Sequence, residues 1–135
     1  YPDGSFRPNG SVTRAEFCAM ASRFFTLESG SLRFTDVAES FWGYRYIASV
    51  VAHGWMTDSE TAYAPNAPIT RAEVVGIVNR MLKRCADETY LKRAENVKRF
   101  GDVPADASFY LDVMEAANGH NFIGAGTDET WTGLK

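Results

Sequence analysis

Two arginines occupy the same place in a segment that the chain contains twice. Arg14 lies in the sequence Thr-Arg-Ala-Glu at residues 13–16, and Arg71 lies in the same sequence at residues 70–73. Each arginine takes the first position of a predicted helix, where backbone N–H groups without intrahelical acceptors make the helix end positive. A guanidinium beside such donors suits a carboxylate, which it binds through two parallel hydrogen bonds. The pattern therefore predicts a site for an acidic group at each position. The alternative is an exposed arginine that forms a salt bridge with a neighbouring element.

The residues around each arginine predict how its helix begins. Thr13 and Thr70 are N-caps, and Glu16 and Glu73 fall at the third helical position, which completes a capping box in both copies. We interpret the two glutamates as capping residues and not as ligand contacts. Apolar residues then recur at helical spacing and predict the buried stripes of the two helices: Phe17, Met20, Ala21 and Phe24 in the first, and Val74, Ile77, Val78, Met81 and Leu82 in the second.

The repetition extends beyond these helix starts. Pro-Asn at residues 8–9 returns at residues 65–66, which is the same separation of 57 positions that relates the two arginines. A fixed spacing of this size is typical of a repeat architecture. A second marker, Phe-x-Asp-Val, occurs at residues 34–37 and again at residues 100–103, which are 66 positions apart.

A helix is predicted after each copy of the second marker, over about residues 41–53 and 108–118. The aspartates of the marker, Asp36 and Asp102, are expected to be turn or cap residues. The two separations differ by nine residues, so an insertion must lie between the second helix start and the second marker. We interpret the charged stretch at residues 83–99 as a helix extension followed by a solvated linker.

These markers divide the chain into three segments. Residues 1–33 form the second half of one repeat, residues 34–99 form a complete repeat with the inserted charged tail, and residues 100–135 form the first half of a third repeat. The Gly- and Thr-rich tail at residues 121–131 is predicted to be a loop, and no long strand is predicted. The chain begins inside a turn-like sequence, so we expect it to be a fragment or a processed product.

Composition bounds the class of protein. The chain has 135 residues, of which 45% are hydrophobic and 23% charged, and this balance is typical of a soluble globular protein. A net charge of −3 argues against a nucleic-acid partner, which needs a concentrated basic surface. The apolar runs are too short to span a bilayer, so no membrane insertion is expected.

No catalytic, metal or cofactor site is predicted. The motifs of serine hydrolases, zinc proteases and phosphate-binding loops are absent from the sequence. His53 and His120 each stand alone and are interpreted as helix-end residues. Cys18 and Cys85 are expected to be free thiols, because neither belongs to a closely spaced pair.

The order of these motifs resembles the S-layer homology domain. That family combines Phe-x-Asp-Val, a helix that contains tryptophan, a glycine-ended turn, a loop of the form Asp-Gly-x-Phe-x-Pro-Asn, and then Thr-Arg-Ala-Glu. Here the loop occurs at residues 3–9, the tryptophan is Trp42, and Gly54 ends the turn. The resemblance covers nearly the whole chain apart from the insertion and about the last dozen residues.

The resemblance implies a non-catalytic module that anchors proteins to the bacterial cell wall or S-layer, outside the cell. Its usual partner is a secondary cell-wall polysaccharide with acidic pyruvyl-ketal groups, and in some bacteria it is modified peptidoglycan. The implied fold is all-α: helix-loop-helix repeats packed around a central helical bundle, here with an incomplete pseudo-threefold. The implied glycan-binding residues are Arg14, Arg71, Trp42, Asp3 and Gly4. For Trp42, packing between helices is the alternative.

The sequence departs from the family pattern in three places. The loop at residues 57–63 lacks the Asp-Gly pair, Ser108 stands where the third segment should carry tryptophan, and the chain ends before a third Thr-Arg-Ala-Glu. With only two central helices, one hypothesis is that chains associate into a homo-oligomer through the incomplete repeats. The alternative function is a protein–protein scaffold that docks a partner on aromatic residues: Phe41, Tyr44, Tyr46, Phe109 and Tyr110.

Overall fold

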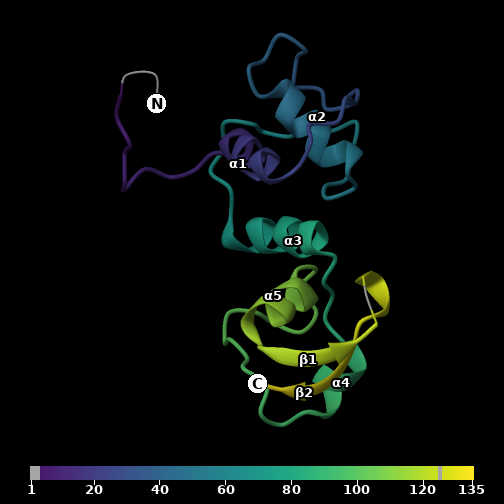
Figure 1. The fold of residues 1–135 in the computed structure, drawn as a ribbon. Coiled ribbons are helices and arrows are strands. Elements are labelled where there is room, and N and C mark those ends of the chain that lie inside the picture. The colour runs from purple at the N-terminus through teal and green to yellow at the C-terminus, as the bar shows by residue number, and fades with distance from the viewer. Residues whose placement is uncertain (1–3, 125) are drawn as a thin grey trace. The chain divides into compact units, whose positions relative to one another are not determined.

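The computed structural model describes residues 4–124 and 126–135, and the chain folds into two compact units. One unit comprises Tyr1–Ile69 and the other Thr70–Lys135 (Figure 1). The boundary falls inside the predicted complete repeat, between its loop and its second helix. The cause lies in packing, because the second helix makes its contacts with later elements of the chain.

Unit 1 is built on two short helices, α1 (Arg14–Ala21) and α2 (Tyr44–Ala52), with a 3-10 turn η1 (Ser22–Phe24) after the first. The two α-helices pack against each other. Their contact is lined by small or branched residues, and the neighbouring loops add three aromatic rings to the core. The buried side chains are Ala15, Cys18, Ala21, Phe34, Val37, Ile47, Ala48, Val50, Trp55 and Tyr63.

The two copies of the repeated segment have the same backbone geometry and pair with each other. Arg7 and Ala64, which are 57 positions apart, both have a φ of 57°. Each begins a turn in which its carbonyl accepts a hydrogen bond of 3.0 Å from the third residue on. Thr13 and Pro68 form an antiparallel bridge, and the Ile69 N–H donates to the Val12 carbonyl at 3.0 Å. These matching conformations confirm the repeat of 57 residues.

The two copies of Phe-x-Asp-Val are also followed by the same backbone structure. The carbonyl of Ala38 accepts from the Phe41 N–H at 2.9 Å, and 66 positions later the carbonyl of Pro104 accepts from the Ala107 N–H at 3.0 Å. The helices that follow, α2 and α5 (Tyr110–Ala117), also begin 66 positions apart. Both predicted helices are therefore present, although each is shorter than its predicted range.

Unit 2 contains three helices and a hairpin. The helices are α3 (Arg71–Leu82), α4 (Glu88–Arg93) and α5, and the strands are β1 (His120–Ile123) and β2 (Thr130–Leu134), which flank the 3-10 turn η2 (Gly126–Asp128). Helix α3 packs on α5. The core is formed by Leu91, Val97, Met114 and Trp131, with Tyr90, Phe100, Val103 and Tyr110 packed around it.

The predicted all-α class is wrong. Strands β1 and β2 form an antiparallel pair in the tail that was expected to be a loop, with His120 opposite Leu134 and Ile123 opposite Thr130. Two glycines with positive φ, Gly124 and Gly126, lie in the segment that joins the two strands. Gly124 has a φ of 88°, and a Cβ atom there would lie 2.3 Å from the carbonyl oxygen of Asp128. The Gly and Thr content that indicated a loop instead belongs to a hairpin whose strands are joined by residues 124–129, and Trp131 of β2 anchors the hairpin in the core.

The interpretation of residues 83–99 as a helix extension and solvated linker is also wrong. Helix α3 ends at Leu82, and Lys83 takes a left-handed conformation with a φ of 53°. The segment then forms a separate helix, α4, which Asp87 caps by accepting from the Tyr90 N–H at 2.8 Å. Two residues of this segment, Leu91 and Val97, belong to the core. In this charged segment, the few apolar residues are the ones that pack into the core.

The predicted stripe of the first helix is only partly buried. Met20 is 48% exposed and Phe24 is 78% exposed, whereas Ala15 and Cys18 are fully buried. The side that packs on α2 is therefore the small-residue side.

Among the described residues, no helix has the length and apolar character that crossing a bilayer requires.

Both predicted capping boxes are present, and they fix where α1 and α3 begin. Thr13 accepts from the Glu16 N–H at 3.2 Å, and Glu16 accepts from the Thr13 N–H at 2.8 Å. The corresponding distances for Thr70 and Glu73 are also 3.2 Å and 2.8 Å.

Replacement of the α3 cap should destabilise unit 2. Thr70→Ala removes the acceptor of the Glu73 N–H and should lower the free energy of unfolding by about 1 kcal/mol. Thr70→Ser keeps the hydroxyl and serves as the matched control. Chemical denaturation monitored by circular dichroism measures both variants. Equal stability of Thr70→Ala and the parent chain would contradict a stabilising role for the cap.

Candidate functional site

The backbone donors at the start of α1 are already engaged. The Arg14 N–H donates to the carbonyl of Ala67 and the Ala15 N–H to that of Pro65, each at 3.0 Å, while the Glu16 N–H donates to the capping threonine. The predicted combination of guanidinium and unsatisfied helix-start donors is therefore not available at this helix. An acidic ligand at Arg14 must be bound through the side chain.

The Arg14 guanidinium is held against an aromatic ring. Its Cζ lies 4.4 Å from the centroid of Tyr63, which is only 4% exposed, and such a contact orients the cation. Burial raises the pKa of Tyr63, and the neighbouring Cys18, whose Sγ is 3.3 Å from the Tyr63 hydroxyl, also has a raised pKa because of burial. Both groups are thus neutral at ordinary pH, and Arg14 provides the positive charge of this region.

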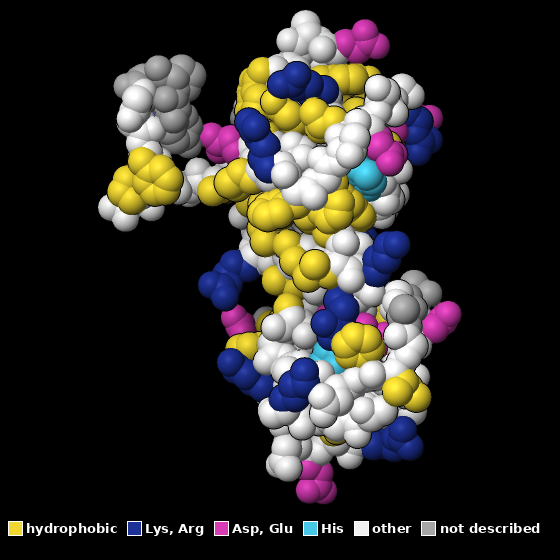
Figure 2. Space-filling view, viewed as in Figure 1, with side chains coloured by type: hydrophobic (Ala, Val, Ile, Leu, Met, Phe, Trp, Pro, Cys, Tyr) yellow, Lys and Arg dark blue, Asp and Glu magenta, His cyan; other side chains and the backbone are white. Residues whose placement is uncertain are grey.

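Trp42 lies close to the start of α1 and offers an exposed ring. It is 53% exposed and contacts Phe41 and Tyr46, with centroid distances of 5.4 and 6.3 Å. A Cβ atom on Gly43 would lie 3.1 Å from that of Ala15, so the positions next to Trp42 and Arg14 are in close contact. Figure 2 shows that hydrophobic and basic side chains are both exposed on unit 1.

The structure describes two of the three remaining predicted ligand residues. Arg71 is exposed as the first residue of α3 in unit 2. Gly4 is exposed with a φ of 76°, a conformation that favours glycine. Asp3 lies outside the described residues. Of the described ligand residues, Gly4, Arg14 and Trp42 belong to unit 1 and Arg71 to unit 2, and within unit 1 the residues next to Arg14 and Trp42 are in close contact.

Asp36 joins two loops of unit 1. Its carboxylate accepts from the Tyr63 N–H at 2.7 Å and from the Ala64 N–H at 2.8 Å. Desolvation acts to raise the pKa of Asp36, but the two backbone donors outweigh it and the pKa is lowered. Its counterpart Asp102 is exposed in a turn of unit 2. Asp36 therefore serves the structure, because it fixes the loop that carries Tyr63 beneath Arg14.

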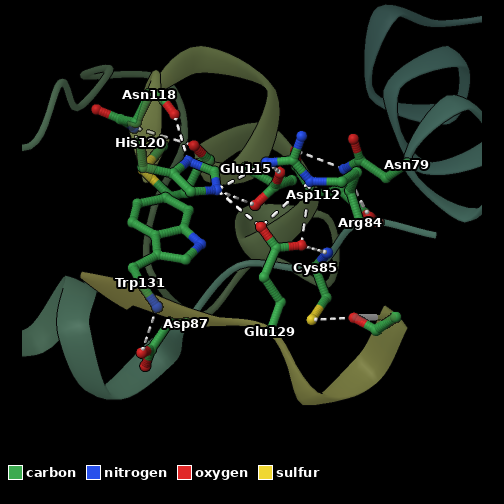
Figure 3. Close-up of polar contacts among 12 residues, drawn as sticks. Asn79, Arg84, Cys85, Asp87, Asp112, Glu115, Asn118, His120, Glu129 and Trp131 are labelled. Carbon is green, nitrogen blue, oxygen red and sulfur yellow. Dashed lines mark hydrogen bonds and ion pairs between the residues drawn. The ribbon is translucent and has the colours of Figure 1, made fainter. Parts of the chain in front are cut away.

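A buried cluster of ionisable groups in unit 2 was not predicted. It consists of Arg84, Glu115, His120 and Glu129 (Figure 3). Glu115 lies in α5 and His120 in β1, whereas Arg84 follows α3 and Glu129 lies between η2 and β2. The side chains of Glu115, His120 and Glu129 are at most 3% exposed, whereas that of Arg84 is 31% exposed. His120 is thus a buried strand residue, and its interpretation as a helix-end residue is wrong.

Arg84 contacts all three of the other groups in this cluster. Its guanidinium lies 2.9 Å from Glu115, 3.0 Å from Glu129 and 2.8 Å from His120 Nε2. Burial raises the pKa of Glu115, and the nearby positive groups only partly oppose this effect. Burial also acts to raise the pKa of Glu129, but hydrogen bonds from His120 and Arg84 outweigh it and lower the pKa.

The cluster ties the hairpin to the helices. His120 stacks on Trp131 with 3.7 Å between ring centroids, and the Trp131 N–H donates to Asp87 at 3.2 Å. Asn118 accepts from the Lys98 N–H at 2.7 Å. No local motif marks these residues in the sequence. The available signal was weak: Glu129 and Trp131 fall in residues 121–131, which were interpreted as a loop, and His120 precedes them and was interpreted as a helix-end residue.

Comparison with known proteins identifies the family. The model of the S-layer homology domain matches residues 1–18 and 33–75. These ranges contain the first helix start, the Phe-x-Asp-Val marker, Trp42 and the second helix start. The chain therefore belongs to the S-layer homology domain family.

Several named proteins are similar to this chain. It is 35% identical over 90% of its length to a cellulosome-anchoring protein of Acetivibrio thermocellus, of which it covers 28%. It is 31% identical over 87% of its length to a surface-layer 125 kDa protein of Lysinibacillus sphaericus, and 28% identical over 84% of its length to an endoglucanase of a Bacillus species. It covers 10% and 12% of these two proteins. The chain thus spans a small part of each.

Substitution of Asp36 should change how the stability of unit 1 depends on pH. Asp36→Asn keeps the shape but removes the charge, and should cost about 1 kcal/mol at neutral pH, a value reduced for the exposure of the side chain. Because the folded pKa lies below the ordinary value of 3.8, the wild-type contribution is present above that pH and is lost as pH falls through the folded pKa. The difference between the two proteins should therefore shrink in acid.

Unfolding midpoints measured between neutral pH and about pH 2 test this expectation. Glu39→Gln is the matched control, because Glu39 is exposed and follows Asp36 in the same loop. A constant difference between Asp36→Asn and wild type at all pH values would show that the carboxylate charge contributes nothing.

Proposed function

We propose that this chain is a non-catalytic anchoring module that binds an acidic cell-wall glycan. Its place is outside the cell, at the bacterial surface, where proteins of this family occur. The proposed ligand is a secondary cell-wall polysaccharide with pyruvyl-ketal carboxylates, and modified peptidoglycan is the second candidate. Family membership and the names of the anchoring and surface-layer relatives support the general role.

One observation supports the choice of ligand. In unit 1, Gly43 and Ala15 are in close contact. The residues next to them are Trp42, whose ring is exposed, and Arg14, whose guanidinium is oriented by Tyr63. An aromatic ring offers an apolar face to the C–H groups of a sugar, and an arginine binds a carboxylate through two hydrogen bonds. Together the two side chains suit a sugar that bears an acidic substituent.

Arg71 is proposed as a second contact. It is exposed at the start of α3, where the helix end favours an anion. Because the helix is twelve residues long and its cap is intact, this favourable field is well defined. Gly4 and Asp3 are proposed to contribute through the loop that they begin.

Any enzymatic activity is proposed to belong to other parts of a longer protein. Neither histidine suits general acid–base work on an external substrate. His53 Nε2 lies 3.1 Å from the Thr26 carbonyl, and His120 is buried within the ionic cluster. The similarity to an endoglucanase covers only 12% of that enzyme.

A protein–protein scaffold is the alternative function. The five aromatic residues on which it depends are half-buried within their own units, and Tyr110 packs on the core of unit 2. This burial favours the glycan reading, because a docking surface needs accessible aromatic area. The association of chains through the incomplete repeats stays a prediction, and light scattering over a wide concentration range would test it.

Co-sedimentation with bacterial wall sacculi tests the anchoring proposal. The wild-type chain should sediment with sacculi and should lose binding after acid extraction of the secondary polysaccharide. Arg14→Lys, Arg71→Ala and Trp42→Ala should each weaken binding about tenfold or more, because each removes a bidentate contact or a stacking surface. Arg23→Ala is the control, because Arg23 is an exposed arginine of the same unit as Arg14.

The outcomes separate the alternatives. Binding that survives acid extraction but needs the two arginines would indicate peptidoglycan as the partner. Binding unaffected by all three substitutions would contradict the assigned residues. No binding by a folded wild-type chain would contradict glycan anchoring by this chain and favour the scaffold. Circular dichroism of each variant confirms that folding is intact.

A further inference from the structure

The buried cluster of unit 2 brings together three groups that are common metal ligands. Ligand atoms of Glu115, His120 and Glu129 all lie within 4.8 Å of one another, and all three residues are buried. His120 Nε2 is 2.9 Å from Glu129 Oε1 and 3.6 Å from Glu115 Oε2. Figure 3 shows the imidazole and the two carboxylates directed toward a common point.

The orientation of His120 leaves one ring nitrogen available as a ligand. Nδ1 lies 2.7 Å from the backbone carbonyl of Asn118. A carbonyl only accepts, so Nδ1 carries a proton and donates. Nε2 faces the two carboxylates and, without metal, donates a hydrogen bond to Glu129 at 2.9 Å. A metal ion would replace this proton and take up the Nε2 lone pair. A backbone carbonyl that fixes the tautomer in this way is a usual feature of histidines that bind metals.

Glu115 supplies an oxygen that has no hydrogen-bond donor. Oε2 is buried and accepts no hydrogen bond within the described residues. A weak hydrogen bond from the Trp131 indole acts to lower the pKa of Glu115, but its geometry is too poor to satisfy either buried atom. A buried carboxylate oxygen without a hydrogen-bond donor is costly, so a bound cation would stabilise it. This oxygen points toward His120 Nε2, which is the same point that the other ligands face.

The spacing of the ligand atoms suits a small dication. Zinc binds nitrogen and carboxylate oxygen at about 2.0–2.2 Å, so tetrahedral ligands lie about 3.3 Å apart. The observed separations from Nε2 of 2.9 and 3.6 Å fall on either side of this value. Two carboxylates and a neutral imidazole also balance the charge of a divalent ion. Calcium and magnesium are less suitable, because they require six or more oxygen ligands.

In the described structure, the Arg84 guanidinium places a positive charge beside His120 and the two carboxylates. Its Nη2 lies 2.8 Å from His120 Nε2 and 2.9 Å from Glu115 Oε1. It is also the most exposed member of the cluster, at 31%, and its Cζ lies 4.5 Å from the ring centroid of the half-exposed Phe122. A guanidinium at the edge of the cluster can turn toward solvent at a lower cost than any of the other three groups can move.

We propose that Glu115, His120 and Glu129 form a site for a divalent transition metal ion of the zinc class, and that Arg84 competes with the metal for it. The site lies within unit 2 and is independent of the glycan contacts proposed above. Bound metal would crosslink α5 to β1 and to the residue that precedes β2. Its effect would therefore be on the stability of unit 2.

Titration of the full chain with zinc and cobalt tests the proposal. The parent chain should bind one Zn²⁺, measured by calorimetry, and one Co²⁺ with the intense visible absorption of a four-coordinate ion. Arg84→Gln should bind zinc at least about tenfold more tightly, because the competing cation is gone. His120→Gln and Glu129→Gln should each weaken binding about 10- to 100-fold, as expected for loss of a ligand.

Matched variants separate this site from adventitious binding. His53→Gln removes the other histidine, which forms an exposed pair with Glu28 at 3.5 Å, and should leave zinc affinity unchanged. Arg80→Gln removes another arginine of the α3 region and should also have no effect. Magnesium should not compete with zinc.

Stability provides a second readout. Without metal, Arg84→Gln should unfold at a lower temperature than the parent, since the buried carboxylates lose their partner. Added zinc should restore the midpoint in Arg84→Gln but not in the double variant that also carries His120→Gln. If Arg84→Gln does not fold without metal, the cobalt spectrum of the parent chain and its loss in His120→Gln decide the question.

Two results would overturn the proposal. One is the absence of zinc and cobalt binding by the folded parent chain and by Arg84→Gln, which would make the cluster a purely ionic support of the hairpin. The other is binding that disappears in His53→Gln and persists in His120→Gln, which would place the metal at the exposed pair.

Discussion

The backbone pairing between the two copies of the repeated segment is the constraint on which unit 1 depends. It joins Val12 to Ile69 and directs the first donors of α1 to the loop at residues 65–67. Tyr63 lies just before that loop. The same pairing therefore places a buried aromatic ring against the Arg14 guanidinium. The repeat is thus both a sequence pattern and a contact, since one copy completes the helix start of the other.

The two units are stabilised in different ways. Unit 1 relies on small side chains between α1 and α2 and on hydrogen bonds from loops, whereas unit 2 combines an apolar core with an ionic cluster. A buried cluster of this kind contributes little net stability unless its charges are compensated. It does restrict geometry, because each group has few alternative partners. This restriction explains how a short hairpin is fixed on α5 and α4.

The elements predicted correctly were those with local signals. The capping boxes of α1 and α3, the helices after Phe-x-Asp-Val and the turn at Gly54 each follow from residues close together in the chain. The hairpin was missed because its signal is distributed. Trp131 is buried only because α4 and α5 cover it, and a Gly-rich connection is equally typical of a loop. The burial of Leu91 and Val97 within residues 83–99 was missed for the same reason.

By itself, the sequence determined the repeat, the helix starts and the family. These properties depend on spacing and on hydrogen bonds within a few residues, which a single chain segment already specifies. Only the tertiary structure decided that the α1 donors are occupied, that His120 is buried, and that Arg84 meets two glutamates from different elements. Such contacts join residues up to 53 positions apart, as between Arg14 and Ala67. Their formation depends on how helices and strands pack, and no local pattern records that packing.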